Sequence, residues 1–262
     1  MCSACGARAT GKLSEASHTI AYPAGLGSDR SGSVRLNLRR PNAERRCLAT
    51  AAKIESSRRA SAALVVRAAV VRERPQARSA VVARLARLDE NHLPTVLGVI
   101  GLRRSAACVT TWYRVELSVL PNETTGWVPA HAVATYRVSS RIVVDLSQRR
   151  LRLYRLGKLT LNVPVAVGAP QTPTPAGRFF VNERYVLPDA SGPFGPAALG
   201  ISAHSTVLEH VWTQNGPIAI HGTNEPASIG DAASHGCIHV ANAVMRRLIA
   251  LVPAGTPVLV QA

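Results

Sequence analysis

The sequence predicts a mainly β protein, in which a small β-barrel precedes a second β-rich domain and few helices occur. Short apolar runs rich in β-branched residues recur from residue 64 onward, with turn residues between them. A proline-rich stretch over residues 170–177 breaks this pattern, because proline donates no hydrogen bond to a strand ladder. Helical spacing of apolar residues stands out over residues 242–251. We therefore expect two β domains, 64–138 and 139–262, behind an N-terminal segment of a different kind.

That segment, residues 1–63, is expected to be a disordered or poorly ordered basic tail. It is rich in Arg, Ser, Ala and Gly and shows no sustained helical or strand period. The whole chain carries 31 Lys and Arg against 15 Asp and Glu, a formal net charge of +16. Such a charge favours anionic partners: nucleic acid, an acidic membrane or an anionic wall polymer. Because basic residues exceed acidic ones in all three segments, the sequence indicates no dedicated nucleic-acid arm, and we expect no nucleic-acid partner.

Targeting signals and paired cysteine motifs are sparse. No run of 18 or more apolar residues occurs, so no transmembrane segment is expected. The first 30 residues lack the apolar core of a secretory signal peptide. The odd number of cysteines leaves at least one thiol unpaired within the chain; they are Cys2, Cys5, Cys47, Cys108 and Cys237. The Cys2–Cys5 pair has no second pair at zinc-finger spacing, so we interpret it as incidental.

The apolar runs of residues 64–138 are short and closely spaced, as in a small β-barrel. The expected strands are Ala63–Val71, Val81–Leu85, Leu93–Ile100, Trp112–Val115 and Gly126–Pro129. The segments "WYRV" and "GWVP", with "RERPQARS" upstream, resemble bacterial SH3-like domains that bind the cell wall. The resemblance implies a module that binds wall polymer. The alternative is that the aromatic residues of this region fill a small β core.

Residues 139–262 carry a second series of strand patterns and one helical pattern. The expected strands are Arg141–Leu146, Leu151–Tyr154, Leu159–Val167, Arg178–Tyr185 and Thr256–Val260, with a turn at Gly157–Lys158 and a loop over 170–177. Over 242–251, Val244, Leu248 and Leu251 share one stripe, and Asn242 is placed to cap the N-terminus of the helix.

Two segments of this second domain carry candidate chemistry, Ile218–Thr223 and Ser234–His239. A cysteine nucleophile needs a nearby base and hydrogen-bond donors for the developing oxyanion. Cys237 supplies the sulfur, and His221 ends an apolar strand from which its imidazole can be aimed. Gly236 has no side chain, so a substrate carbonyl can approach the backbone N–H groups near positions 236 and 237.

Two other interpretations of these residues stay open. A buried cysteine is usually an inert, small apolar side chain, and Cys237 taken alone would be structural. The second interpretation is a metal site that combines Cys237 with His221, His235 and His239. The glycine turn between positions 235 and 237 disfavours that ligand set, because it interrupts the alternation of a strand.

The combination of these segments indicates one protein family more specifically than Cys237 or His221 does alone. "HGTNEPASIGDAASHGCIHVAN" resembles the signature of the L,D-transpeptidase (YkuD-like) family, with a His, a Gly-containing insert, Ser-His-Gly-Cys and a downstream Asn. "VGAPQTPTPAGRF" resembles that family's Thr-Pro-Thr-Pro-x-Gly segment, and "DASGPFGPAALGISAH" resembles its loop over the active site. The resemblance covers residues 139–262. It implies a mostly β catalytic domain that needs no metal or organic cofactor.

The resemblance also implies a role for each matching position. Cys237 matches the acylated nucleophile, and His221 matches the base, oriented by the backbone carbonyl of Gly222. The residues expected to support the oxyanion and the turn are Gly222, Ser234, His235 and Gly236. The residues expected to bind substrate are His239 and Asn242. Arg is common in the family at the position of His239, and a neutral imidazole binds a carboxylate less well than a guanidinium does.

The implied activity is the cross-linking of peptidoglycan stem peptides. A cysteine thiolate attacks the carbonyl of the third residue of a tetrapeptide stem, D-Ala leaves, and the amine of a second stem resolves the thioester. A carbapenem is expected to acylate the same cysteine. Water in place of the amine makes the enzyme an L,D-carboxypeptidase. The remaining alternatives are an inactive wall-binding protein of the same fold and a basic protein that binds zinc or nucleic acid. The implied location is the cell wall or periplasmic space, although no signal peptide is visible.

Overall fold

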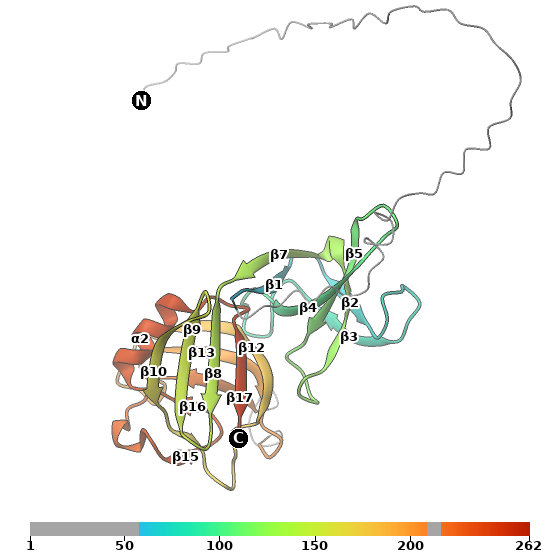
Figure 1. The fold of residues 1–262 in the computed structure, drawn as a ribbon. Helices are drawn as coiled ribbons and strands as arrows, with labels where there is room; N and C mark the ends of the chain where they lie inside the picture. Colours follow the sequence, from blue (N-terminus) through green and yellow to red (C-terminus); the bar gives the residue numbers. More distant parts are fainter. Residues whose placement is uncertain (1–57, 209–215) are drawn as a thin grey trace, which may run out of the picture. The chain divides into compact units, whose positions relative to one another are not determined.

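The computed structural model describes residues 58–208 and 216–262, and β-strands dominate this part of the chain (Figure 1). The predicted mainly β class is therefore confirmed. Most of the predicted tail lies outside the described residues, but strand β1 begins at Ala60, inside the range expected for the tail. Small side chains explain the difference, because Ala62 and Ala63 are fully buried in this strand. No helix of the described residues is long and apolar enough to span a bilayer.

We call residues 58–138 the N-terminal lobe. Its strands form one antiparallel sheet in the order β3-β2-β6-β5-β4-β1-β7. Aliphatic side chains such as Val71, Val115 and Val128 make up its core. The strands are β1 (Ala60–Val65), β2 (Ala69–Arg72), β3 (Val81–Leu85), β4 (Val96–Arg104), β5 (Thr110–Glu116), β6 (Thr125–Pro129) and β7 (Val133–Val138), with a 3-10 turn at Ala130–Ala132 before β7.

Residues 139–262 form the C-terminal lobe, built on a sheet in the order β10-β9-β8-β17-β12-β13-β14-β16. A two-stranded pair, β11 and β15, lies outside this sheet. The elements are β8 (Ser140–Asp145), β9 (Arg150–Arg155), β10 (Lys158–Pro164), β11 (Val167–Gly168), β12 (Gly177–Val186), β13 (Ala197–His204), β14 (Pro217–His221), a 3-10 turn (Pro226–Ser228), β15 (Ala232–Ser234), β16 (Ile238–His239), α2 (Asn242–Leu251) and β17 (Pro257–Gln261).

A single apolar core fills the C-terminal lobe. Strand residues alternate inward and outward, so that β8 buries Ile142 and Val144 while Val143 is partly exposed. Helix α2 adds Met245 and Leu248 to the same core. Val244 and Leu251 are partly buried and pack against this core, so the predicted stripe of the helix is confirmed, with Met245 as a further buried position.

Three departures from the predicted elements have physical reasons. The run Ala63–Val71 is two strands, β1 and β2, because the chain leaves the sheet between them. The run Leu159–Val167 is likewise divided, and β10 ends at Pro164, which donates no ladder hydrogen bond. Residues 197–204, expected within a loop, form β13, which is buried on both faces between β12 and β14.

The predicted helix cap is also wrong by one position. Ala241 is the N-cap residue of α2, and it makes no side-chain cap hydrogen bond. Asn242 is the first helical residue, and its side chain bonds to other segments of the lobe.

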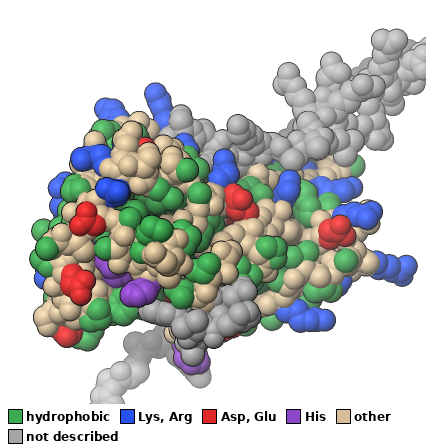
Figure 2. Space-filling view, turned by 90° about the horizontal axis from the view of Figure 1, so that it is seen from below, with side chains coloured by type: hydrophobic (Ala, Val, Ile, Leu, Met, Phe, Trp, Pro, Cys, Tyr) green, Lys and Arg blue, Asp and Glu red, His purple; other side chains and the backbone are tan. Residues whose placement is uncertain are grey.

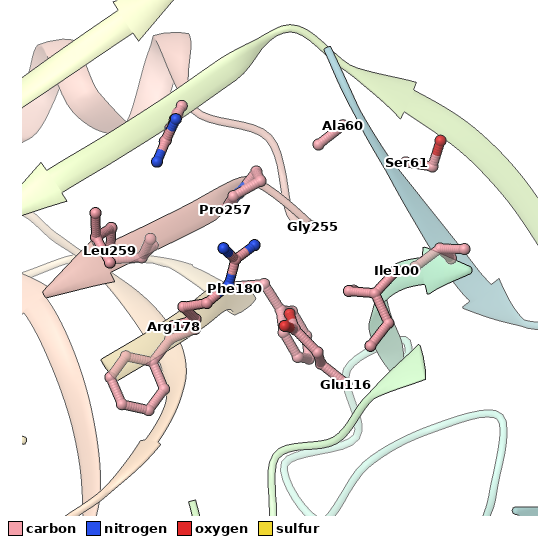
Figure 3. A pocket seen from close by; sticks show the side chains of 14 residues that line it. Ala60, Ser61, Ile100, Glu116, Arg178, Phe180, Gly255, Pro257 and Leu259 are labelled. Atoms are coloured by element: carbon pink, nitrogen blue, oxygen red, sulfur yellow. The ribbon is translucent and has the colours of Figure 1, made fainter. Parts of the chain in front are cut away.

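A small pocket is lined by strands β1, β4 and β5 of the N-terminal lobe and by β12 and β17 (Figure 3). Glu116, Arg178 and Phe180 contribute side chains to it. Neither Cys237 nor His221 lines this pocket, so it does not mark the candidate active site. Lys and Arg side chains are scattered over the face seen in Figure 2 and do not gather in one patch there.

Candidate active site

The candidate nucleophile lies in a tight turn between β15 and β16. Ser234 is the last residue of β15, and β16 begins directly after Cys237. Gly236 adopts a φ of +112°, a conformation that residues with a side chain rarely take. A Cβ atom at this position would also lie 3.0 Å from Ile218 Cδ1. The turn therefore requires glycine directly before the cysteine.

Strand register brings the candidate base to the same face as the cysteine. Strands β14 and β16 are parallel neighbours, and His221 lies opposite His239. Paired residues share a face of the sheet, and side chains alternate along each strand. Cys237, two residues before His239, projects to that same side, and the backbone of Ala219 on β14 hydrogen-bonds to its sulfur. Segments distant in sequence thus converge at one sheet edge.

The ring of His221 lies against a backbone carbonyl. Its Nδ1 lies 2.5 Å from the carbonyl oxygen of Gly222. Because a carbonyl only accepts hydrogen bonds, Nδ1 carries the proton and Nε2 keeps its lone pair. Burial, with 3% of the residue exposed, and to a lesser extent the neighbouring His239 together lower the pKa of His221 to about 4, against the opposing effect of the Gly222 hydrogen bond. The ring is therefore neutral near pH 7 and can accept a proton.

Cys237 is a free thiol and is partly exposed. Burial of the sulfur raises the pKa of this thiol, and the hydrogen bond from the Ala219 backbone opposes that increase. Combined with the lowered pKa of His221, this makes the resting pair a neutral thiol and a neutral imidazole. Nucleophilic attack by the sulfur therefore requires proton transfer to a base at the moment of reaction.

The turn itself is tied together by Ser234. Its Oγ accepts a hydrogen bond from the Gly236 N–H at 3.1 Å and donates one to the Cys237 carbonyl at 2.5 Å. The N–H groups near positions 236 and 237 were both expected to serve an oxyanion, but the first is already occupied. His235 lies between Ser234 and Gly236 with its side chain exposed, and its ring makes no hydrogen bond among the described residues.

His239 lies beside the candidate base. The ring centroids of His221 and His239 are 4.4 Å apart, at an interplanar angle of 44°. His239 Nδ1 is buried and has no hydrogen-bond partner within the described part of the chain. Burial lowers the pKa of His239, and the charge of Glu225 opposes this. Within residues 58–208 and 216–262 no group of three or more His, Cys, Asp or Glu side chains is arranged to hold a metal ion.

The side chain of Asn242 hydrogen-bonds to two segments next to the candidate site. Its Oδ1 accepts a hydrogen bond from the Thr223 N–H at 2.8 Å, and its Nδ2 donates one to the Ala190 carbonyl at 3.4 Å. The amide thus joins the start of α2 to the turn after His221 and to the loop before β13. Both ends of the side chain are engaged within the protein, while a contact with substrate stays a prediction.

Three contributors to the site were not singled out from the sequence. Phe194, 41% exposed, packs edge-on against His221 with ring centroids 4.8 Å apart. Thr172 and Thr174 bind backbone carbonyls of the cysteine turn. All three occur in segments that carry the family resemblance, where Phe194 is the single aromatic residue of its loop. The threonines act 62 positions away in the chain, so no local spacing reveals their partners.

Comparison with known proteins relates the C-terminal lobe to the L,D-transpeptidase (YkuD) family. The L,D-transpeptidase catalytic domain (YkuD) model matches residues 139–260. The YkuD protein of Bacillus licheniformis is 42% identical over 118 residues, which are 45% of this chain and 63% of that protein. The YkuD protein of Bacillus subtilis is 36% identical over 125 residues, 48% of this chain and 68% of that protein. The chain therefore spans less than two thirds of the length of the first of these relatives.

Solved L,D-transpeptidase structures are also similar to the chain. A mutant of the Enterococcus faecium enzyme is 28% identical, with 47% of this chain and 49% of that chain covered and a TM-score of 0.37. An L,D-transpeptidase from Mycobacterium tuberculosis is 20% identical, with 64% of this chain and 90% of that chain covered and a TM-score of 0.42.

Proposed function

Because the chain belongs to the L,D-transpeptidase family, we propose that it cross-links peptidoglycan stem peptides through a thioester on Cys237. The observation that carries this proposal is the orientation of His221. Its Nδ1 is held by the Gly222 carbonyl, and its ring projects from the same sheet face as the thiol. That arrangement leaves Nε2 as a base for Cys237.

Acylation starts with the neutral pair. His221 Nε2 takes the thiol proton as the Cys237 sulfur attacks the carbonyl carbon of the third stem residue. The carbonyl electron pair moves to oxygen, where the Cys237 N–H donates a hydrogen bond to the oxyanion. When the intermediate collapses, the bond to D-Ala breaks and the imidazolium returns its proton to the leaving amine. The product is a thioester with a neutral His221.

The second half resolves the thioester. The side-chain amine of another stem attacks the thioester carbonyl, and His221 accepts a proton from the attacking nitrogen. The carbon–sulfur bond then breaks, and the imidazolium protonates the leaving sulfur, so the thiol and the neutral base are regenerated. Attack by water in place of the amine gives a shortened stem with a free carboxylate, which is L,D-carboxypeptidase activity.

Residues beside the base are proposed to receive the stem peptide. His239 and Phe194 both contact the ring of His221, so a stem peptide bound between this ring and Cys237 is expected to contact them. His239 is partly exposed, and a neutral imidazole suits a hydrogen bond to a substrate amide or carboxylate better than an ion pair. Asn242 supports the loop that carries Phe194 indirectly, through its hydrogen bond to the Ala190 carbonyl.

The N-terminal lobe is proposed to be an SH3-like module, residues 64–138, that holds the catalytic domain, residues 139–262, on the wall. Its sheet carries a Trp/Arg face, which we define as Arg72, Arg103, Trp112, Arg114 and Trp127. The strand register places these residues on one face of the sheet, because Arg103 lies opposite Trp112, and Trp127 lies opposite both Arg114 and Arg72. Neither tryptophan belongs to the buried core of this lobe. The face thus combines flat apolar rings with guanidinium groups that pair with carboxylates.

These assignments imply a location outside the cytoplasm, in the cell wall or periplasmic space, where peptidoglycan is found. Wall carboxylates supply the negative charge that complements the chain's net charge of +16.

Product analysis tests the proposed activity. The purified protein is incubated with tetrapeptide-bearing muropeptides, and the products are identified by mass. Release of D-Ala together with a cross-linked dimer is the expected result, and Cys237→Ala is expected to give neither. A tripeptide product without dimer would establish the carboxypeptidase instead. Absence of any product with folded wild-type protein would favour an inactive wall-binding protein of this fold.

A further inference from the structure

The loop before β12 clamps the turn that carries the candidate nucleophile. Thr174 lies in this loop between two prolines and is 6% exposed. Its Oγ1 accepts a hydrogen bond from the Gly168 N–H and donates one to the Gly236 carbonyl, both at 2.8 Å. One buried hydroxyl therefore ties β11 to the turn. The flanking prolines restrict the backbone of this loop, which keeps the hydroxyl in place.

The backbone N–H of the candidate nucleophile is left without a protein partner. Thr172 Oγ1 binds the Ser234 carbonyl at 3.0 Å, and the Ser234 hydroxyl engages the Gly236 N–H and the Cys237 carbonyl. By contrast, the Cys237 N–H has no acceptor among the described residues. Because this N–H belongs to the residue that carries the sulfur, it can serve a group bound at that sulfur.

Thr174 controls the direction of that donor. The Gly236 carbonyl and the Cys237 N–H belong to the same peptide unit, which is planar and trans, so the two groups point in opposite directions. A hydrogen bond that fixes the carbonyl therefore also fixes the N–H. We propose that Thr174 is a positioning residue that aims the Cys237 N–H at the oxyanion formed during acylation. This inference rests on the proposed acyl-enzyme function.

Two reactions of the Cys237 sulfur, acylation and alkylation, distinguish an oxyanion-positioning role of Thr174 from a general structural role. Acylation by a carbapenem converts a lactam carbonyl into a tetrahedral oxyanion, which needs the aimed N–H. Alkylation by iodoacetamide forms a carbon–sulfur bond at a methylene carbon while iodide leaves and the thiol proton passes to a base. Alkylation needs the thiol and its base, but it forms no oxyanion. The ratio of the two rates therefore reports the oxyanion donor alone.

The experiment measures both rates at Cys237 in the full chain, by peptide mass mapping because the chain has five cysteines. Loss of a whole oxyanion donor costs about 10²–10³-fold, so a misaimed donor in Thr174→Val is expected to slow acylation by about 10–100-fold. Alkylation is expected to stay within about 2-fold of wild type, and Thr174→Ser is expected to retain most of the acylation rate. Thr160→Val is the matched control, because it removes a hydroxyl that donates to a backbone carbonyl on β10, at the opposite edge of the sheet from β16.

Several results would overturn the assignment. An unchanged acylation rate in Thr174→Val, an equal fall of both rates, or a Thr174→Ser variant as slow as Thr174→Val would each refute it. If Thr174→Val does not fold, Thr174→Ala removes the hydroxyl without adding an atom, and the same criteria apply to it. A wild-type protein that is alkylated but never acylated would refute the acyl-enzyme proposal itself. A normal wild-type acylation rate with no effect of the substitutions would refute the Thr174 role alone.

Discussion

The two lobes use polar and aromatic side chains in different ways. In the C-terminal lobe, buried hydroxyls of Thr174 and Ser234 point inward and bind backbone groups of the cysteine turn. In the N-terminal lobe, Trp112 and Trp127 lie on the side of the sheet opposite an aliphatic core. The first arrangement fixes the backbone of the cysteine turn, which the proposed chemistry at one carbonyl requires. The second places side chains along a surface, which suits contact with a large polymer. The contrast predicts that substitutions in one lobe change reaction rates and substitutions in the other change retention on the wall.

Removal of the base is expected to have the largest effect. A positioned general base contributes about 10²–10⁴-fold, so His221→Ala should slow acylation of Cys237 by a factor in that range at neutral pH. Raising the pH should partly restore the rate, since hydroxide then deprotonates the thiol. His235→Ala should change the rate little, because its exposed side chain makes no hydrogen bond among the described residues. Acylation followed by intact mass against pH measures both variants, and matching profiles would leave the base unassigned.

The pH dependence of acylation in wild-type protein also tests His221 as the base. The pKa of His221 is lowered from 6.5 to about 4, so the ring stays in its basic form as the pH falls through 6.5 and becomes protonated only near pH 4. Acylation that depends on this ring should therefore persist below pH 6 and fall off near pH 4. An acid limb centred near pH 6.5 in wild-type protein would contradict the buried, neutral His221.

The turn glycine offers a matched pair of substitutions. Gly236 and Gly230 have nearly equal φ values, +112° and +108°, but a Cβ at Gly236 meets Ile218, whereas a Cβ at Gly230 meets nothing within 4 Å. Each change to Ala should cost about 1–3 kcal/mol through backbone strain. Gly236→Ala should in addition slow acylation more than about 10-fold, in line with a disturbed oxyanion donor. Melting curves and acylation rates test this pair, and equal acylation in both variants would argue against the turn geometry.

Asn242 provides a smaller test within the C-terminal lobe. Asn242→Ala leaves the N–H of buried Thr223 without its acceptor, which should lower the free energy of unfolding by about 1–3 kcal/mol. Asn162→Ala is the control, since this exposed side chain on β10 accepts only from Arg150, and its loss should stay within about 0.5 kcal/mol. Denaturant unfolding of both variants gives the comparison. If Asn242→Ala lowers the free energy of unfolding no more than Asn162→Ala does, Asn242 does not stabilise these segments.

The smallest effects are expected in the N-terminal lobe. Trp112→Ala and Trp127→Ala should weaken retention of the full chain on peptidoglycan sacculi several-fold, with acylation of Cys237 unchanged. Wild-type retention should fall as salt rises, because exposed charges are screened beyond about 10 Å at 0.1 M salt. Tyr113→Phe is a control in the same strand, whose side chain packs toward the core. Full retention of both tryptophan variants would make these rings structural and remove the Trp/Arg face as a binding surface.

The sequence predicted the strands better than the connections between them. Alternating runs such as Arg141–Leu146 and Val81–Leu85 correspond closely to β8 and β3, because local periodicity determines which face is buried. The strand β13 was missed because burial on both faces removes the alternation. Cys237, His221 and the Gly222 carbonyl could be singled out as candidates because they lie in the short segments that carry the family resemblance. Thr174 and Phe194 could not be assigned, since their partners depend on contacts between distant segments that only the folded chain creates.

The most direct test of the acyl-enzyme is the intact mass of the full chain after exposure to a carbapenem. The account predicts that wild-type protein gains the mass of one carbapenem, that the adduct maps to Cys237, and that folded Cys237→Ala gains nothing. The other four cysteines supply an internal control, because none of them lies in a Ser-His-Gly-Cys segment. An adduct that persists in Cys237→Ala, or a folded wild-type protein that gains no mass, would contradict Cys237 as the nucleophile.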